Sequence, residues 1–355
     1  MSDDHKSVDF SKWAVVGFKD DTGLGRMSRD IQKVLGVTKH LVSPSERMPT
    51  SEIQSPREFL MGPGLNQETL RKQMDGLEGI ICLERLHWNE LLVPTAKQLG
   101  LKVVCVPMWE WFRGTDPEWR DADLFLCPNR KSEEVLHSYG FKNTVQMAWP
   151  LNLDLLPVRT IQGNAQTFIH NAGLIDHDDR KGTQSVVKAF GKVRNKDLRL
   201  ILRLQQEAPF SVNDPRVDVR IGNLQNPADL YKEGDAAIQP SRMEGLGFMV
   251  LEPVCCGLPV ITTDAEPMNE YVQQPEMRAR PSLIKRKSFA WKAASIKHAY
   301  LTSPSVSSLA RVIQWCSKND LSRISEENRN YGWTRHASQQ MARQWGVTLN
   351  HLLEN

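Results

Sequence analysis

Short apolar runs alternate along the first half of the chain with segments of helical spacing. The apolar runs cover residues 13–18, 79–83, 102–106 and 122–127, and the helical segments cover residues 27–35, 88–99 and 132–139. Continuous apolar runs of about four to eight residues are typical of strands that are buried on both faces of a parallel sheet. The pattern therefore predicts an α/β architecture with helices on both faces of the sheet.

A second α/β pattern begins near Thr167. Its predicted strands are residues 167–170, 198–202, 217–221 and 259–262, and its predicted helices are residues 183–190 and 248–254. The proline-containing stretch 148–157 separates the two patterns and is interpreted as a linker. Residues 43–66 are interpreted as a loop, and residues 306–354 are predicted to be helical. Two domains are expected, because 355 residues exceed what one compact core usually holds.

Composition narrows the class of protein. Hydrophobic residues make up 40% and charged residues 25%, with a net charge of +3, which implies neither a nucleic-acid partner nor a membrane. None of the six cysteines forms a C-x-x-C pair, and the first residues contain no apolar signal segment. No motif for a metal site is present. We expect a cytoplasmic protein with reduced cysteines, no transmembrane segment and no bound metal.

A glycine-containing stretch follows the first predicted strand. Gly23 and Gly25 lie between that strand and the predicted helix 27–35. Such a loop lets a backbone approach a phosphate, but the spacing lacks the full G-x-G-x-x-G pattern and is equally compatible with a tight turn.

The stretch from Gln239 to Asp264 contains the densest group of candidate functional residues. Glu244 and Glu252 are separated by seven residues, and Gly245 and Gly247 lie between them, directly before the apolar run 248–254. A glycine-preceded helix offers backbone N–H groups and a positive dipole end to a phosphate. Carboxylates can accept hydrogen bonds from sugar hydroxyls. This combination indicates a nucleotide-sugar site.

This stretch resembles the E-x7-E signature of retaining GT-B glycosyltransferases, most closely those of family 4. Residues 230–236 resemble the segment that precedes the signature in that family, and the resemblance covers residues 167–272 well and the remainder loosely. It implies two Rossmann-like domains whose parallel sheets face each other across a cleft. Residues 1–157 would bind the acceptor and residues 158–333 the nucleotide sugar, and the helix 334–355 would cross back to the first domain, with Trp333, Trp345 and Leu349 as anchors.

The resemblance also implies roles for individual residues. Glu244 would lie at the transferred sugar and Glu252 at the ribose, and Lys181 matches the family's K-G lysine, which stabilises the leaving diphosphate. The family's usual arginine is missing from residues 171–173, so Arg180, Arg203 and Arg242 are candidates for its role. The donor-binding set is Gly23, Gly25, Gly245, Leu246, Gly247, Phe248, Glu252 and Arg203. Glu270 is a further candidate near the donor, or a helix-capping residue.

Acceptor-side candidates lie in the first domain. Glu84 follows the apolar run 79–83, His87 comes three residues later, and Trp109, Glu110 and Trp111 follow the run 102–106. A carboxylate at a strand end can orient an acceptor hydroxyl or accept its proton, but these side chains are also compatible with solvated loops. The tryptophans can stack on a sugar or base, although packing beneath a loop is favoured, with one face open to the cleft.

The resemblance implies a metal-independent retaining hexosyl- or pentosyltransferase without a cofactor, which moves a sugar from a nucleoside diphosphate sugar to a hydroxyl acceptor. Lipid, protein and small-molecule acceptors stay open. The basic residues Lys285, Arg286, Lys287, Lys292 and Lys297 make hydroxymethylated bases of DNA an alternative acceptor. A non-catalytic nucleotide-sugar binding module is the alternative outside the enzymes.

Overall fold

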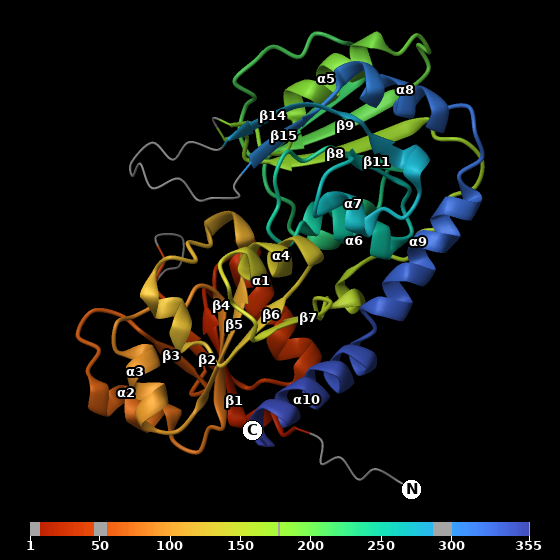
Figure 1. The fold of residues 1–355 in the computed structure, drawn as a ribbon. Helices are drawn as coiled ribbons and strands as arrows, with labels where there is room; N and C mark the ends of the chain where they lie inside the picture. The colour runs from red at the N-terminus through yellow and green to blue at the C-terminus, as the bar shows by residue number, and fades with distance from the viewer. Residues whose placement is uncertain (1–7, 46–54, 177, 287–299, 355) are drawn as a thin grey trace, which may run out of the picture. The chain divides into compact units, whose positions relative to one another are not determined.

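The computed structural model of the chain describes residues 8–45, 55–176, 178–286 and 300–354 (Figure 1). These residues form two compact units. The first unit comprises Met1–Asn152 together with Arg335–Asn355, and the second comprises Leu153–Thr334. The acceptor and donor roles expected for the two halves of the chain stay predictions.

The first unit is built on a seven-stranded parallel sheet with the strand order β3-β2-β1-β4-β5-β6-β7. Its strands are β1 Trp13–Gly17, β2 Lys39–Val42, β3 Glu58–Leu60, β4 Gly79–Glu84, β5 Lys102–Pro107, β6 Leu124–Cys127 and β7 Thr144–Gln146. Its helices are α1 Gly23–Asp30, continued by a π-helical turn at Ile31–Leu35, then α2 Gln67–Met74, α3 Leu92–Gln98, α4 Arg130–Ser138 and α10 Ser338–Glu354.

The second unit contains a six-stranded parallel sheet with the order β10-β9-β8-β11-β12-β13 and an antiparallel pair, β14-β15. Its strands are β8 Thr167–Gly173, β9 Arg199–Leu204, β10 Val217–Ile221, β11 Ala236–Gln239, β12 Val260–Thr263, β13 Arg278–Ala279, β14 Pro281–Arg286 and β15 Tyr300–Pro304. Its helices are α5 Thr183–Lys192, α6 Phe248–Cys256, α7 Met268–Tyr271, α8 Val306–Cys316 and α9 Ser322–Arg335.

Both sheets contain the buried strands that the apolar runs predict. Every residue of β1, β6, β11 and β12 is buried, because helices cover both faces of a parallel sheet. The α/β architecture with two parallel sheets is confirmed. All six cysteines are buried free thiols. Among the described residues, the helices are either too short or too polar to cross a membrane.

The C-terminal helix α10 packs within the first unit. Trp345 and Leu349 are buried, and the indole Nε1 of Trp345 donates to the carbonyl of Ala148 at 3.3 Å. The ring centroids of Trp345 and Trp149 are 6.3 Å apart. These two predicted anchors therefore pack as expected.

Trp333, the third predicted anchor, is 51% exposed, so that prediction is wrong. The reason lies in α9, where the preceding residue, Gly332, faces the core. A Cβ atom on Gly332 would lie 2.7 Å from the Cα of Cys255, so this face of the helix packs closely and Trp333 points elsewhere.

Two predicted helix boundaries are also wrong. α3 begins at Leu92 rather than Trp88, because the indole of Trp88 donates to the carbonyl of Leu83 at 2.9 Å and holds the preceding residues in a turn. The first helix begins at Gly23 rather than Met27, because Thr22 caps it and accepts a hydrogen bond from the backbone N–H of Gly25 at 3.3 Å.

We expect acid to destabilise this fold through three buried histidines. Burial lowers the pKa of His40, His170 and His336 from 6.5 to about 4. The unfolded chain therefore takes up these protons first as the pH falls. The free energy of unfolding should decrease between pH 6.5 and pH 4, by up to about 1.4 kcal/mol per pH unit for each histidine.

Urea unfolding at pH 7 and pH 5 measures this dependence. Replacing His170 with glutamine should reduce the slope with pH. Equal stability at both pH values would contradict the prediction.

Candidate functional site

A buried ion pair joins the segments that follow β8 and β11. The Nζ atom of Lys181 lies 2.5 Å from Oε1 of Glu244, and their side chains are 18% and 8% exposed. β8 and β11 are neighbours in the parallel sheet, so the segments that leave their carboxyl ends lie close together. The fold thus brings together two predicted site residues that are far apart in the sequence.

The Glu244 carboxylate is held in its charged form. Burial by itself raises its pKa, but the positive charges of Lys181 and Arg180 and hydrogen bonds to the carboxylate outweigh burial, so the pKa lies below its usual value. Glu244 is therefore a hydrogen-bond acceptor at neutral pH, which suits contact with the hydroxyls of a sugar.

Helix α6 begins directly beside this pair. Its N-cap residue, Gly247, has φ +81°, and a Cβ atom there would lie 3.3 Å from the ring of Tyr271 and 3.5 Å from the Cβ of Glu244. The hydroxyl of Tyr271 donates to the carbonyl of Leu246 at 2.6 Å and fixes the turn. Gly245 and Leu246 are buried and Phe248 is partly exposed. The positive end of the helix dipole thus lies beside Lys181 and Glu244.

Glu252 lies one helical turn after the start of α6. Its Oε2 accepts a hydrogen bond from the hydroxyl of Tyr231 at 2.6 Å, and the residue is 5% exposed. Tyr231 is the last residue of the 3-10 helix Pro227–Tyr231, which precedes β11. Sequence reasoning missed Tyr231 as a partner, although the tyrosine stands in the segment that resembles the family before the signature.

Replacing Glu252 with glutamine is expected to weaken nucleoside diphosphate binding by about 10-fold with a smaller change in kcat, because one charge-assisted hydrogen bond to a hydroxyl contributes about 1.5–3 kcal/mol. Isothermal titration calorimetry with nucleoside diphosphates measures this effect. Replacing Tyr231 with phenylalanine should weaken binding less, because that change only loosens the carboxylate. An unchanged affinity in the Glu252 variant would contradict the predicted contact.

The three candidate arginines lie in two places. Arg180 pairs with Asp176, its Nε lying 3.3 Å from Oδ2, and its carbonyl accepts from the backbone N–H of Arg242 at 2.7 Å. The side chain of Arg242 donates to the carbonyl of Asp178. Both arginines therefore belong to the loops around Lys181 and Glu244, whereas Arg203 does not.

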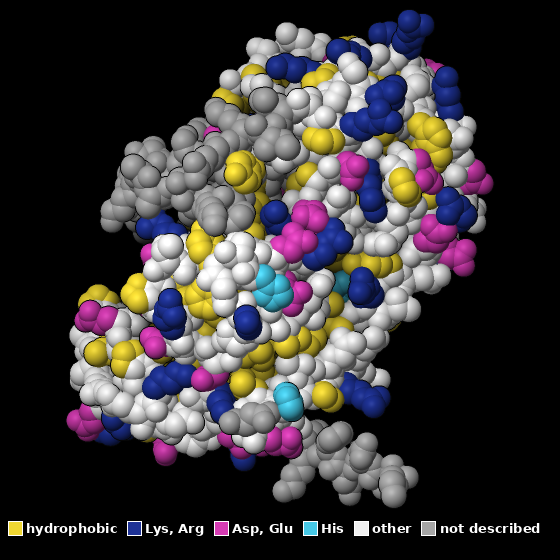
Figure 2. Space-filling view, viewed as in Figure 1, with side chains coloured by type: hydrophobic (Ala, Val, Ile, Leu, Met, Phe, Trp, Pro, Cys, Tyr) yellow, Lys and Arg dark blue, Asp and Glu magenta, His cyan; other side chains and the backbone are white. Residues whose placement is uncertain are grey.

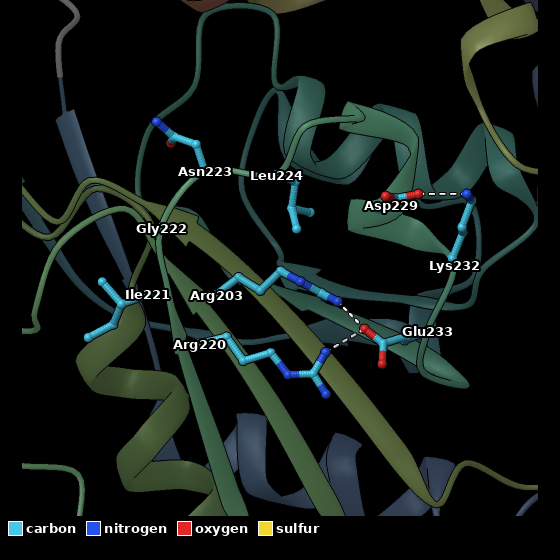
Figure 3. A pocket seen from close by; sticks show the side chains of 9 residues that line it. All are labelled: Arg203, Arg220, Ile221, Gly222, Asn223, Leu224, Asp229, Lys232 and Glu233. Atoms are coloured by element: carbon cyan, nitrogen blue, oxygen red, sulfur yellow. Dashed lines mark hydrogen bonds and ion pairs between the residues drawn. The ribbon is translucent and has the colours of Figure 1, made fainter.

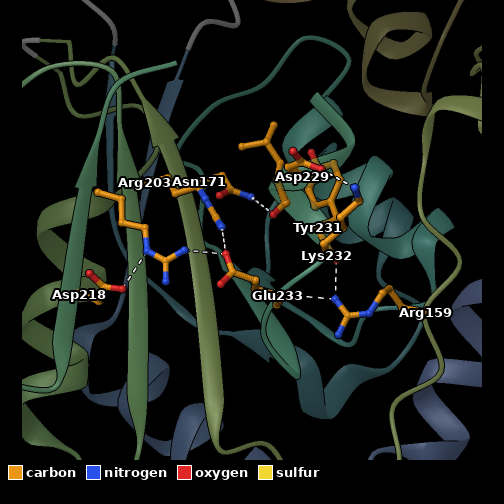
Figure 4. A network of polar contacts seen from close by, with 10 residues as sticks. Arg159, Asn171, Arg203, Asp218, Asp229, Tyr231, Lys232 and Glu233 are labelled. Carbon is orange, nitrogen blue, oxygen red and sulfur yellow. Dashed lines mark hydrogen bonds and ion pairs between the residues drawn. The ribbon is translucent and has the colours of Figure 1, made fainter. Parts of the chain in front are cut away.

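Arg203 lies near the end of β9, where its guanidinium is paired with the carboxylate of Glu233 (Figure 3). The same carboxylate accepts from Nη1 of Arg220 at 2.6 Å, and Arg220 also pairs with Asp218 at 2.8 Å. Figure 4 labels both acidic residues, Asp218 and Glu233. Arg203, Arg220 and Glu233 border a pocket of about 500 Å³. Its lining consists of Arg203, Arg220, Ile221, Gly222, Asn223, Leu224, Asp229, Lys232 and Glu233.

In the first unit, Glu84 is the last residue of β4 and has φ +67°. His87 contacts Glu118, with 2.7 Å between Nε2 and Oε1, and both side chains are more than one third exposed. Trp109 and Glu110 are buried and Trp111 is 44% exposed. Trp109–Trp111 form a 3-10 turn rather than extended backbone, so their side chains do not alternate. Trp109 is packed, as the favoured interpretation expects, and Trp111 is exposed.

Gly23 and Gly25 lie in the first turn of α1 and not in a loop. A Cβ atom on Gly25 would lie 1.9 Å from the carbonyl oxygen of Asp20, whereas one on Gly23 would meet no atom within 4 Å. Packing against the preceding backbone therefore explains Gly25, and a donor contact for either glycine stays a prediction.

No group of three or more metal-ligating side chains was found in the part of the chain that the structure describes. The basic residues 287, 292 and 297 lie outside the described residues. Glu270 is the third residue of α7, whose N-cap residue Pro267 has no N–H to receive a capping carboxylate, so the capping role is wrong and a contact near the donor stays a prediction.

Comparison with known proteins finds a family model that matches part of the second unit. Residues 166–296 match the family model described as glycosyl transferases group 1, and this range includes Lys181, Glu244 and Glu252. A search of curated proteins gave no match.

Solved structures share the fold over nearly the whole chain. Sucrose-phosphate synthase from Thermosynechococcus elongatus is 15% identical with a TM-score of 0.64, covering 96% of this chain and 99% of that chain. A glycosyltransferase from Rickettsia africae is 12% identical with a TM-score of 0.68, covering 97% and 99%.

UDP-GlcNAc 2-epimerase from Neisseria meningitidis, solved with UDP-GlcNAc bound, is 10% identical with a TM-score of 0.51, covering 97% and 99%. At these identities the likeness concerns the fold alone. Together with the family match over residues 166–296, the two parallel α/β sheets support a glycosyltransferase with the GT-B fold.

Proposed function

We propose that this protein is a retaining glycosyltransferase of family 4 that transfers a sugar from a nucleoside diphosphate sugar to a hydroxyl acceptor without a metal ion. The observation that carries the proposal is the buried Lys181–Glu244 pair beside the start of α6. It places a cation, a charged carboxylate and a helix N-terminus together, and the matched family segment contains all three.

Each group has a definite task in this reaction. The leaving diphosphate develops negative charge, which Lys181, Arg180 and the backbone N–H groups at the start of α6 stabilise without a metal. Glu244 accepts hydrogen bonds from hydroxyls of the transferred sugar, and Glu252 does the same for the ribose. In a retaining reaction without a covalent intermediate, the leaving phosphate itself takes the proton of the acceptor.

The test is turnover of a panel of uridine, guanosine and adenosine diphosphate sugars in the presence of EDTA. NMR of the released or transferred sugar gives its anomeric configuration at early times. The proposal expects slow donor hydrolysis with retention of the anomeric configuration. The right acceptor should increase the rate at which the donor is consumed. An inverted product, or activity that EDTA abolishes and Mg²⁺ restores, would contradict it.

Epimerisation of a nucleotide sugar is a second candidate, because an epimerase bound to UDP-GlcNAc shares the fold over 97% of this chain. The match to the glycosyl transferases group 1 model favours transfer. The same panel separates the two reactions, since an epimerase would give an epimeric sugar and a transferase would give a new glycosidic bond or hydrolysis. A non-catalytic module would bind donors and leave all of them intact.

For the acceptor, we propose a hydroxyl compound oriented by side chains of the first unit, with Glu84 as the first candidate. Hydroxymethylated DNA is included as an acceptor in the panel. On the face drawn in Figure 2, Lys and Arg side chains are interspersed with Asp and Glu. Among the described residues on this face there is no single-sign stripe of the kind that is typical of nucleic-acid binding, and the acceptor panel begins with small hydroxyl compounds.

A further inference from the structure

Arg203 has buried N–H groups without an acceptor. The residue is 7% exposed, and its Nη2 is paired with Glu233. Its Nε and Nη1 atoms are buried and have no hydrogen-bond partner among the residues that the structure describes. Buried donors of a charged group are nearly always satisfied in native proteins, so these two groups indicate where an acceptor belongs.

The surroundings of Arg203 define the chemistry of that acceptor. The Nζ of Lys232 pairs with Asp229 at 2.6 Å, and Arg220 pairs with Asp218 and Glu233. Arg203, Arg220 and Lys232 are thus matched by three carboxylates, and the pocket does not require a full negative charge. Uncharged carbonyl oxygens satisfy its donors.

The pocket also has an apolar side. Ile221 and Leu224 contribute apolar surface, and both side chains are at least 40% exposed. Figure 3 shows Arg203 and Arg220 pointing toward Glu233, with Leu224 on the other side of Arg203. A ligand with a flat apolar face and carbonyl oxygens on its edge fits both features.

The position of the pocket connects it to the proposed donor site. β9 and β10 end beside the pocket. In the sheet, β9 is the neighbour of β8, and β8 and β11 lead into the segments that carry Lys181 and Glu244. Tyr231, which holds Glu252, directly precedes two lining residues, Lys232 and Glu233. Along this edge, phosphate, ribose and base of a nucleotide would follow one another in that order.

We propose that Arg203 determines which nucleobase the donor carries. Its Nε and Nη1 donate to carbonyl oxygens of uracil or guanine and disfavour adenine, which presents an amino group where those bases carry a carbonyl. A site with built-in donors rejects a ligand that leaves them unpaired. This inference rests on the proposed function, because it assumes a nucleoside diphosphate donor.

Isothermal titration calorimetry with uridine, guanosine and adenosine diphosphates tests it. The wild-type protein should bind the uridine or guanosine compound at least about 10-fold more tightly than the adenosine compound, as one base contact typically discriminates by that order. Arg203→Met should weaken binding of the preferred nucleotide by about 10-fold or more and leave adenosine diphosphate within about 3-fold, so that the preference disappears.

Matched variants control for the loss of a positive charge and for correct folding. Arg220→Met removes a lining cation whose side chain is 42% exposed, and it should keep the preference. Arg203→Met leaves Glu233 paired with Arg220, so the fold should persist. If that variant does not fold, Arg203→Lys keeps the charge beside Glu233, and it should still lose most of the preference, because it lacks the guanidinium N–H groups.

The outcomes separate this inference from the proposed function. If the wild-type protein binds adenosine diphosphate as tightly as the other two, or if Arg203→Met keeps the preference, the inference is wrong and nucleotide binding stands. If none of the three compounds binds, both are wrong. Lys181→Ala should weaken the binding of all three nucleoside diphosphates by the same factor. This result distinguishes a contact with the phosphates from selection of the base.

Discussion

Replacing Lys181 with alanine is expected to lower kcat by about 100- to 1,000-fold, with a smaller effect on nucleoside diphosphate affinity. Loss of one preorganised donor to a developing anion costs about 2.7–4 kcal/mol in the transition state. Lys181 fits that role because its side chain is only 18% exposed and its ammonium pairs with Glu244 beside the start of α6. Steady-state kinetics with a nucleotide-sugar donor measures the effect.

The same change has a second consequence, through Glu244. Burial raises the pKa of Glu244, and the positive charge of Lys181 opposes that effect. Without Lys181, the pKa of Glu244 should therefore rise. The carboxylate then becomes protonated at higher pH than in the wild-type protein. The acidic limb of the pH–rate profile should move to higher pH, an effect that simple loss of a surface charge would not cause.

Two controls accompany this variant. Lys188→Ala removes an exposed lysine on α5, the helix that begins two residues after Lys181, and it should retain full activity. Thermal unfolding of Lys181→Ala shows whether a partly unpaired Glu244 lowers stability, since breaking a buried ion pair destabilises a protein. A folded Lys181→Ala enzyme with wild-type kcat would remove the lysine from the mechanism.

Much of the fold could be predicted from the sequence because buried parallel strands carry an unambiguous apolar signal. The runs at 79–83 and 102–106 lie within strands of the structure, and the run at 198–202 begins one residue before β9. Helix starts were less predictable, because side-chain contacts decide them. The cap at Thr22 and the hydrogen bond from Trp88 to Leu83 each shift a boundary, and neither changes the apolar pattern.

The candidate site was predictable as a set of residues but not as a set of contacts. The spacing of Glu244 and Glu252 and the glycines between them are local features, so they could be read from the sequence. The pairing of Lys181 with Glu244 joins residues 63 positions apart, and it depends on the adjacency of β8 and β11. The open donors of Arg203 likewise become visible only once burial is known.

Glu84 illustrates a feature that only the structure reveals. It has φ +67°, a left-handed backbone conformation that side chains other than glycine rarely adopt. Such strain costs on the order of 1 kcal/mol or more and tends to persist at functional positions. Glu84 is the last residue of β4, at the carboxyl end of a parallel strand, where ligands bind in α/β proteins.

We therefore expect Glu84→Gln to lower sugar transfer by about 100-fold and to leave nucleoside diphosphate affinity unchanged, because misplacing a reacting hydroxyl costs on the order of 100-fold in rate. Donor hydrolysis, which needs no acceptor, should fall less than transfer. Glu78→Gln is the matched control, because Glu78 directly precedes the same strand at its amino end and pairs with Lys12 on the surface.

Glu84→Gly separates the strain from the chemistry. Glycine adopts positive φ without penalty, so this variant should be at least as stable as the wild-type protein, although glycine also makes the unfolded chain more flexible and offsets part of the gain. It should be as inactive in transfer as Glu84→Gln. A Glu84→Gly protein that is more stable and poorly active would indicate that the fold tolerates the strain for the sake of the carboxylate. Full transfer activity in both variants would show that Glu84 has no part in the reaction.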